Sequence, residues 1–282
     1  MTDPLSARTT GDRDLPEIDI TVAHAARTYD YLLGGNDNFA VDREAIERGS
    51  AAHPGGVETA RTNARAQRAF LGRAVRYLAG DEVGIRQFLD IGTGIPGRDN
   101  VHAVAQEVAP EARIVYVDND PVVLAHAHTL LRGMPKGSTA FVDGDVREPD
   151  RILARAGETL DFTQPVGVIL VGILHVIGDE DDPYAIVAAL LEPLPAGSHL
   201  VISHLAGDIR PEEMAEVFAR FNRTMRHPYT LRGHADVVRF FDGLTILDPG
   251  VVPLDRWYLP GMPTAEADGT VIPAYGAVAR KP

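Results

Sequence analysis

The chain has 282 residues, no cysteine and a formal net charge of −13 at pH 7, and 45% of its residues are hydrophobic. This length and apolar share fit one large α/β domain with an extension. The negative charge argues against a nucleic-acid partner, because neutralising phosphates requires a basic surface. Without cysteine, disulfides, thiolate catalysis and cysteine-ligated zinc are excluded.

The sequence shows no membrane or secretion signal. Residues 1–10 lack the apolar stretch of a signal peptide. The longest apolar run, 166–177, is too short to span a bilayer and contains glycine. We therefore expect a cytoplasmic protein with no membrane partner.

The N-terminal quarter of the chain predicts a tail followed by helices. Residues 1–19 are polar, charged and contain proline, a composition typical of a disordered tail. Residues 20–80 predict a helical cap or lid, because glycines and an apolar stripe divide them into helical segments. The expected helices are 21–33, 42–48 and 57–78.

From residue 81 to residue 282, apolar strand patterns alternate with helical ones, which predicts a Rossmann-like, doubly wound α/β sheet of seven strands. The run 166–173 is apolar without alternation, as in a central parallel strand covered on both faces. The expected strands are 86–91, 113–118, 139–143, 166–173, 198–203, 244–248 and 274–280. The helices between them are expected near 100–109, 121–132, 183–192, 211–224 and 234–241.

A glycine turn, Gly92-Thr93-Gly94, follows the first of these strands. Its glycines allow a sharp bend and leave room for a ligand against the main chain. The next strand ends on Asp118, which is 118 − 94 = 24 residues past the second glycine. In an α/β fold both strand ends face one crevice, where this carboxylate can accept hydrogen bonds from a ribose. The pair predicts a nucleoside-containing ligand.

Residues 92–97 also match G-x-G-x-x-G, so an NAD-dependent oxidoreductase is one interpretation. Two features oppose it: Asp90 would repel a pyrophosphate, and the loop 96–99 moves the next helix away from the glycines. A carboxylate beside the turn instead suits a ligand with an ammonium group. S-adenosylmethionine has an ammonium, a sulfonium, a ribose and an adenine, and Asp145 at the third strand end can accept from the adenine amine.

Three segments, 90–94, 116–121 and 143–147, resemble the first motifs of class I S-adenosylmethionine-dependent methyltransferases. More narrowly, the chain resembles, over about residues 21–280, a bacterial methyltransferase family long catalogued as a domain of unknown function. The resemblance implies the seven-stranded class I methyltransferase sheet and S-adenosyl-L-methionine as cofactor. The cofactor-binding residues expected within these motifs are Asp90, Gly92, Thr93, Gly94, Asp118, Asn119, Asp145 and Val146.

Two histidines are candidates for the chemistry. Methyl transfer from a sulfonium depends largely on holding the nucleophile in line, and a hydroxyl acceptor also benefits from a general base. His175 follows the fourth strand at the lip of the crevice and is the leading base candidate, with packing or a cofactor-side role as the alternative. His204 follows the fifth strand and is a candidate for lining the acceptor pocket.

The cap supplies two further cofactor candidates. Tyr31 belongs to an aromatic and amide cluster at 29–39, which is either a capped turn or a lid over the cofactor. Arg61, Arg65 and Arg68 share one helix face, which is either solvated or provides Arg68 as a partner for the methionyl carboxylate.

We therefore expect an enzyme that transfers a methyl group from S-adenosylmethionine to an oxygen or nitrogen atom of a small-molecule acceptor. No metal site is expected. The alternatives are an NAD-dependent oxidoreductase and a non-catalytic S-adenosylmethionine-binding protein.

Overall fold

The computed structural model describes residues 18–97, 100–130, 138–259, 262 and 271–282, without the side chains of 127–130 and 138. The predicted tail, residues 1–19, lies almost wholly outside the described residues. Within the described part of the chain, no helix is long and apolar enough to cross a lipid bilayer.

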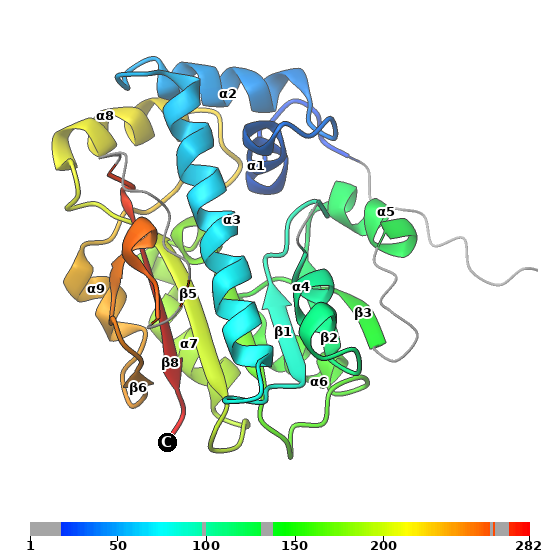
Figure 1. Cartoon of the computed structure of the whole chain (residues 1–282). Coiled ribbons are helices and arrows are strands. Elements are labelled where there is room, and N and C mark those ends of the chain that lie inside the picture. Colours follow the sequence, from blue (N-terminus) through cyan, green and yellow to red (C-terminus); the bar gives the residue numbers. More distant parts are fainter. Residues whose placement is uncertain (1–17, 98–99, 131–137, 260–261, 263–270) are drawn as a thin grey trace, which may run out of the picture.

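The described strands form one eight-stranded sheet in the order β3-β2-β1-β4-β5-β8-β6, with β7 paired to β8 (Figure 1). Strands β1 to β5 are parallel, and β8 runs antiparallel to β5, β6 and β7. The predicted doubly wound sheet is confirmed, and β7 is an unpredicted two-residue addition. The strands are β1 (Gln87–Ile91), β2 (Arg113–Asp118), β3 (Ser138–Asp143), β4 (Gly167–Val171), β5 (His199–Leu205), β6 (Thr245–Ile246), β7 (Val252–Pro253) and β8 (Ala274–Arg280).

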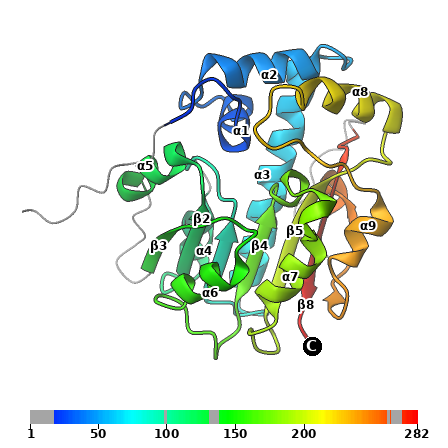
Figure 2. The same cartoon turned by 180° about the vertical axis from the view of Figure 1, so that it is seen from behind.

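Helices cover both faces of the sheet (Figures 1 and 2). On one face, α3 (Val57–Ala79) and α4 (Val101–Val108) bury apolar residues such as Phe70 and Val101 against the strands. The other face is covered by α6 (Pro149–Ala156), α7 (Pro183–Leu191) and α9 (His234–Arg239). Helix α6 was not predicted, although Ile152 and Ala156 lie one turn apart and are both buried.

Three helices lie over the carboxyl ends of the parallel strands: α1 (Ala25–Leu33), α2 (Ala40–Ser50) and α8 (Pro211–Phe221) (Figure 1). Their shared core includes Ala45, Ile46, Phe221 and Met225. Helix α3 extends from this layer down to the sheet (Figure 1). This layer therefore combines two N-terminal helices, α1 and α2, with α8 from the C-terminal third of the chain.

Buried polar contacts attach α1 to the rest of the molecule. The carboxylate of Asp42 accepts hydrogen bonds from the backbone amides of His24 (3.0 Å) and Phe39 (2.9 Å) and lies 3.4 Å from Nε of Arg27. The side chain of His24 lies 2.6 Å from Asp120, between β2 and α5 (Pro121–Leu130). Asp42 is fully buried and Asp120 almost so. Breaking such a pair leaves an uncompensated buried charge, so these contacts fix α1 over the end of β2.

Candidate functional site

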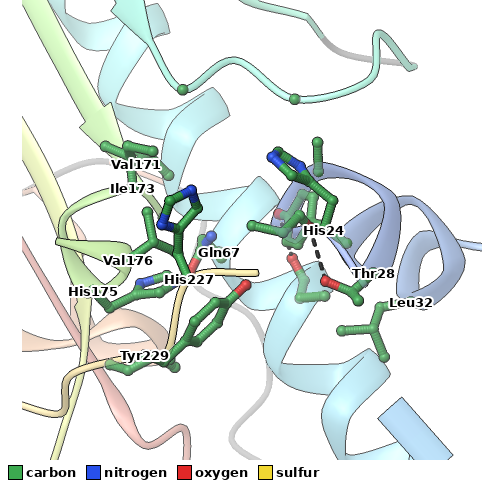
Figure 3. Close-up of a pocket in the computed structure, with 18 of the residues that line it drawn as sticks. His24, Thr28, Leu32, Gln67, Val171, Ile173, His175, Val176, His227 and Tyr229 are labelled. Carbon is green, nitrogen blue, oxygen red and sulfur yellow. Dashed lines mark hydrogen bonds between the residues drawn. The ribbon is translucent and has the colours of Figure 1, made fainter. Parts of the chain in front are cut away.

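A cavity lies where β1, β2 and β4 end and α1, α2, α3 and α8 cover them, and Figure 3 shows part of its lining. The strand-end residues predicted to bind the cofactor all line it. They are Asp90, Gly92, Thr93, Gly94, Asp118, Asn119, Asp145 and Val146. Arg68 and His175 also line this cavity.

The glycine turn gives the cavity its backbone wall. Gly92 and Gly94 have φ values of +73° and +67°, a region that side chains strongly disfavour. A Cβ at Gly92 would lie 2.7 Å from the side chain of Ile173, so glycine is also required there for packing. A Cβ at Gly94 would have no heavy atom of the described residues within 4 Å of it. The turn thus leaves open space beside Gly94, as a bound ligand requires.

The carboxylate of Asp118 joins the glycine turn after β1 to the loop after β2. One carboxylate oxygen accepts from the amide of Gly94 (2.8 Å), and the other accepts from Asn119 (2.9 Å) and Asp120 (3.0 Å). Burial raises the pKa of this carboxyl, while the amides of Asp120 and Gly94 act in the opposite direction. Among the described residues Oδ2 accepts only the Gly94 amide, so its second lone pair leaves acceptor capacity for a ligand hydroxyl.

Asp90 is buried at the end of β1. Burial raises its pKa to about 7, while the positive charge of Arg68 and a hydrogen bond with the Thr93 side chain oppose that rise. Arg68 is itself positioned by Asn100, whose side-chain oxygen lies 3.3 Å from its guanidinium. A ligand cation beside Asp90 would stabilise the charged form of the carboxyl, so this position suits an ammonium group.

Asp145 lies at the other end of the row of strand-end acids. Its oxygens accept from the Asn119 side-chain amide (3.0 Å) and from the Arg147 guanidinium (3.2 Å). Arg147 also donates to Asp181 at 2.7 Å. Asp145 is therefore partly neutralised, and any contact with an adenine amine shares the carboxylate with these donors.

His175 lies in the short 3-10 turn Leu174–Val176. Strand β4 ends at Val171, two residues earlier than predicted, and is followed by Gly172, whose φ is +79°. His175 is 5% exposed, and the centroid of its ring lies 4.4 Å from the centroid of the Tyr229 ring. Burial, followed by the charges of His204 and Arg232, lowers its pKa well below the ordinary value. Its Nδ1 has no hydrogen-bond partner among the described residues. His175 is thus a neutral imidazole at the cavity wall.

Arg232 holds the turn that carries His175. This buried guanidinium donates to the carbonyl oxygens of Leu174 (3.1 Å) and Ile177 (3.0 Å), on either side of the histidine, and to Asp179 (2.6 Å). These contacts fix the backbone on both sides of His175.

His204 does not line the cavity in the described structure, which corrects its assignment to the acceptor pocket. Its Nε2 lies 3.0 Å from the Arg232 guanidinium, which can only donate, so Nε2 must be the acceptor nitrogen. Its Nδ1 therefore carries the proton and donates to Leu205 at 2.8 Å. Burial lowers the pKa of His204 to about 4. Both nitrogens are in use, so His204 has a structural role.

Tyr31 is also placed away from the described cavity lining: its hydroxyl donates to Glu47 at 3.2 Å and its ring lies under Arg61. Tyr29 lines the cavity instead, with its hydroxyl 3.1 Å from the carbonyl oxygen of Ala64. Thr28, Tyr29 and Leu32 share the inner face of α1, whereas Tyr31 points elsewhere. Reading the helical spacing of α1 would have selected Tyr29.

Several other lining residues escaped the sequence analysis. They come from α3 and from the segment after α8, and include Asn63, Gln67, His227 and Tyr229. Figure 3 shows the last three of these. No motif marks them, because they meet only in the folded chain. A helical spacing of four residues along α3 relates Asn63 to Gln67, and Gln67 directly precedes Arg68.

The sheet order, the glycine turn and the row of strand-end acids define a class I S-adenosylmethionine-dependent methyltransferase. The family model of S-adenosyl methyltransferases matches residues 12–282, and the chain belongs to this family.

Two solved structures are similar over nearly the whole chain. One is a DUF574 family protein from Streptomyces avermitilis, with 45% identity and a TM-score of 0.87, over 94% of this chain and 100% of that one. The other is a putative methyltransferase from Thermobifida fusca, with 34% identity and a TM-score of 0.84, over 96% and 99% of the two chains. Comparison with curated proteins gave no match. The family establishes S-adenosylmethionine as the cofactor.

The geometry predicts the effect of Asp118→Ala. The substitution removes both the predicted ribose contacts and the acceptor that orders Gly94, so S-adenosylhomocysteine should bind more weakly by about 2 kcal/mol or more, roughly 30-fold. Calorimetric titration measures this. Asp143→Ala is the matched control, because Asp143 ends the neighbouring strand at the same level but is exposed and outside the cavity lining. Equal affinities in the two variants would contradict the assignment.

Proposed function

We propose that the protein transfers the methyl group of S-adenosylmethionine to an oxygen or nitrogen atom of a small molecule bound beneath the cap. One observation carries this proposal: a single cavity connects the strand-end acids with the neutral His175 and with a region under α1, α2 and α8. A site recessed beneath three helices favours a small acceptor over a polymer. We also propose residues 20–80 as the cap and 81–282 as the cofactor-binding domain, with α8 completing the cap.

The position of each residue in the cavity indicates its role. S-adenosylmethionine supplies an electrophilic methyl group on its sulfonium. Asp118 accepts from the ribose hydroxyls, Asp90 faces the methionyl ammonium, and Arg68 is the candidate partner for the methionyl carboxylate. The imidazole of His175, whose backbone turn Arg232 holds, takes the proton of a hydroxyl acceptor. Helices α1, α2 and α8 shield the site from water.

Two alternatives fit less well. In an NAD-dependent oxidoreductase, a carboxylate at position 90 would face a pyrophosphate in a buried site, where like charges repel most strongly. A non-catalytic S-adenosylmethionine-binding protein needs no cavity beyond the cofactor and no neutral histidine beside it. The continuation of the cavity under the cap supports an enzyme.

Asp90 gives this proposal a pH dependence. Its pKa is about 7, so below that pH a proton must leave before the carboxylate can face the ligand ammonium. Raising the pH from about 5 to about 7 should strengthen S-adenosylhomocysteine binding, toward a limit of tenfold per pH unit, with a plateau above. The ligand ammonium stays protonated over this range and adds no slope. Calorimetry across pH measures the effect. Asp90→Asn should lose most of this slope and keep only what the raised pKa of Asp118 contributes, and a flat wild-type profile would refute the ammonium contact.

His175→Ala tests the proposed base. Turnover, measured as S-adenosylhomocysteine formed with a panel of small alcohols, phenols and amines, should fall by about 10² to 10⁴ for a hydroxyl acceptor, while cofactor affinity stays nearly constant. His126→Ala is the control, because His126 lies on α5 outside the described cavity lining and pairs with Asp37. A larger loss in His227→Ala than in His175→Ala would move the base to His227. Cofactor binding without turnover of any compound in the panel would favour the non-catalytic alternative.

A further inference from the structure

The cavity has a second end, remote from the glycine turn, which we call the acceptor chamber. It is lined by Leu32 of α1, Ile46 of α2, Ala60 and Asn63 of α3, and Phe218 and Phe221 of α8. Helix α3 passes along both ends of the cavity. Arg68 lies beside Asn100 at the cofactor end, and Ala60 is eight residues earlier, about 12 Å along the helix axis. The part of the chamber at Ala60 therefore lies beyond the reach of the cofactor contacts.

Charge is distributed unevenly between the two ends. The charged side chains of the described lining lie at the strand ends, on α3 at Arg68, and after α8 at Arg226, which is exposed. The six side chains of the acceptor chamber carry no charge, and five of them are apolar. A charged acceptor moved into this chamber would lose its hydration without gaining an opposite charge, so the chamber selects uncharged molecules.

Aromatic rings connect the chamber to the proposed base. The Phe218 ring is stacked on Tyr229 with centroids 5.8 Å apart and planes at 24°, and Tyr229 lies 4.4 Å from the His175 ring. Phe221 meets Tyr229 edge to face at 5.0 Å. Aromatic rings prefer stacked or edge-to-face partners at such separations. A flat ring in the chamber would continue this series and lead toward His175.

One polar atom in the chamber wall lacks a partner. The side-chain oxygen of Asn63 is buried and receives no hydrogen bond from any described residue. Unpaired buried acceptors are costly and uncommon, and an oxygen in this position can accept from a ligand hydroxyl or amine. The chamber thus combines an uncharged aromatic wall with one hydrogen-bond acceptor.

We propose that the methyl acceptor is an uncharged, hydroxylated aromatic molecule, with its ring against Phe218 and Tyr229 and a hydroxyl donating to Asn63. This inference rests on the proposed function. A second hydroxyl, directed at the cofactor, is the nucleophile. Its oxygen forms the bond to the methyl carbon while the carbon–sulfur bond breaks, the electron pair of that bond stays on sulfur, and the proton passes to the imidazole of His175. The products are the methyl ether and S-adenosylhomocysteine.

The test uses the full chain saturated with S-adenosylhomocysteine and two probes with the same ring: naphthalene-2,6-diol, which is neutral, and naphthalene-2,6-dicarboxylate, which is charged. By calorimetry, the diol should bind one per chain and about tenfold or more tightly than the dicarboxylate. Phe218→Ala and Asn63→Leu should each weaken diol binding by about fivefold or more. Leu33→Ala, a change on the exposed side of α1, is the control and should leave it unchanged.

The outcomes separate this inference from the function on which it rests. Unchanged S-adenosylhomocysteine affinity in Phe218→Ala and Asn63→Leu shows that those variants are folded. Dicarboxylate binding as tight as the diol, absence of diol binding, or diol binding insensitive to both substitutions would overturn the inference while leaving the cofactor site intact. Failure of the wild type to bind S-adenosylhomocysteine would instead overturn the proposed function.

Discussion

The carboxylate of Asp118 is the contact on which the rest of the site depends. It accepts three backbone amides, from Gly94, Asn119 and Asp120, and so joins the glycine turn after β1 to the loop after β2. A buried carboxylate is stable only with such donors, and burial still raises its pKa. The same contacts therefore shape the ligand site, while the burial of the carboxylate imposes a cost that a ligand with hydroxyl donors can offset.

The influence of this loop extends to the cap through Asp120. Its carboxylate lies 2.6 Å from His24, and the amide of His24 donates to Asp42 on α2. The residues nearest the nucleoside site are thus connected, within three contacts, to the helices that cover the acceptor chamber. The geometry links the two halves of the cavity physically, because the buried carboxylates of Asp42 and Asp120 attach α1 within a layer otherwise held by apolar packing.

The sequence predicted what depends on local pattern. The strands, the turn at Gly92 and the acids at their ends follow from periodicity, glycine and spacing, and the fold confirms their arrangement. What failed depends on tertiary contact. His204 could not be recognised as structural because its partner, Arg232, is 28 residues away, and Tyr31 was preferred to Tyr29 because helical facing was not resolved. The contribution of α8 to the cap was invisible for the same reason: nothing in residues 211–221 signals which helices they meet.

The central claim is that one cavity binds S-adenosylmethionine at the strand ends and its acceptor under the cap. A crystal structure with S-adenosylhomocysteine tests it most directly. The ribose hydroxyls should lie within hydrogen-bond distance of Asp118, the amino group beside Asp90, and the sulfur should face His175 and the acceptor chamber. A ligand with its amino acid group at Asp145, or with its sulfur turned away from the chamber, would contradict the account.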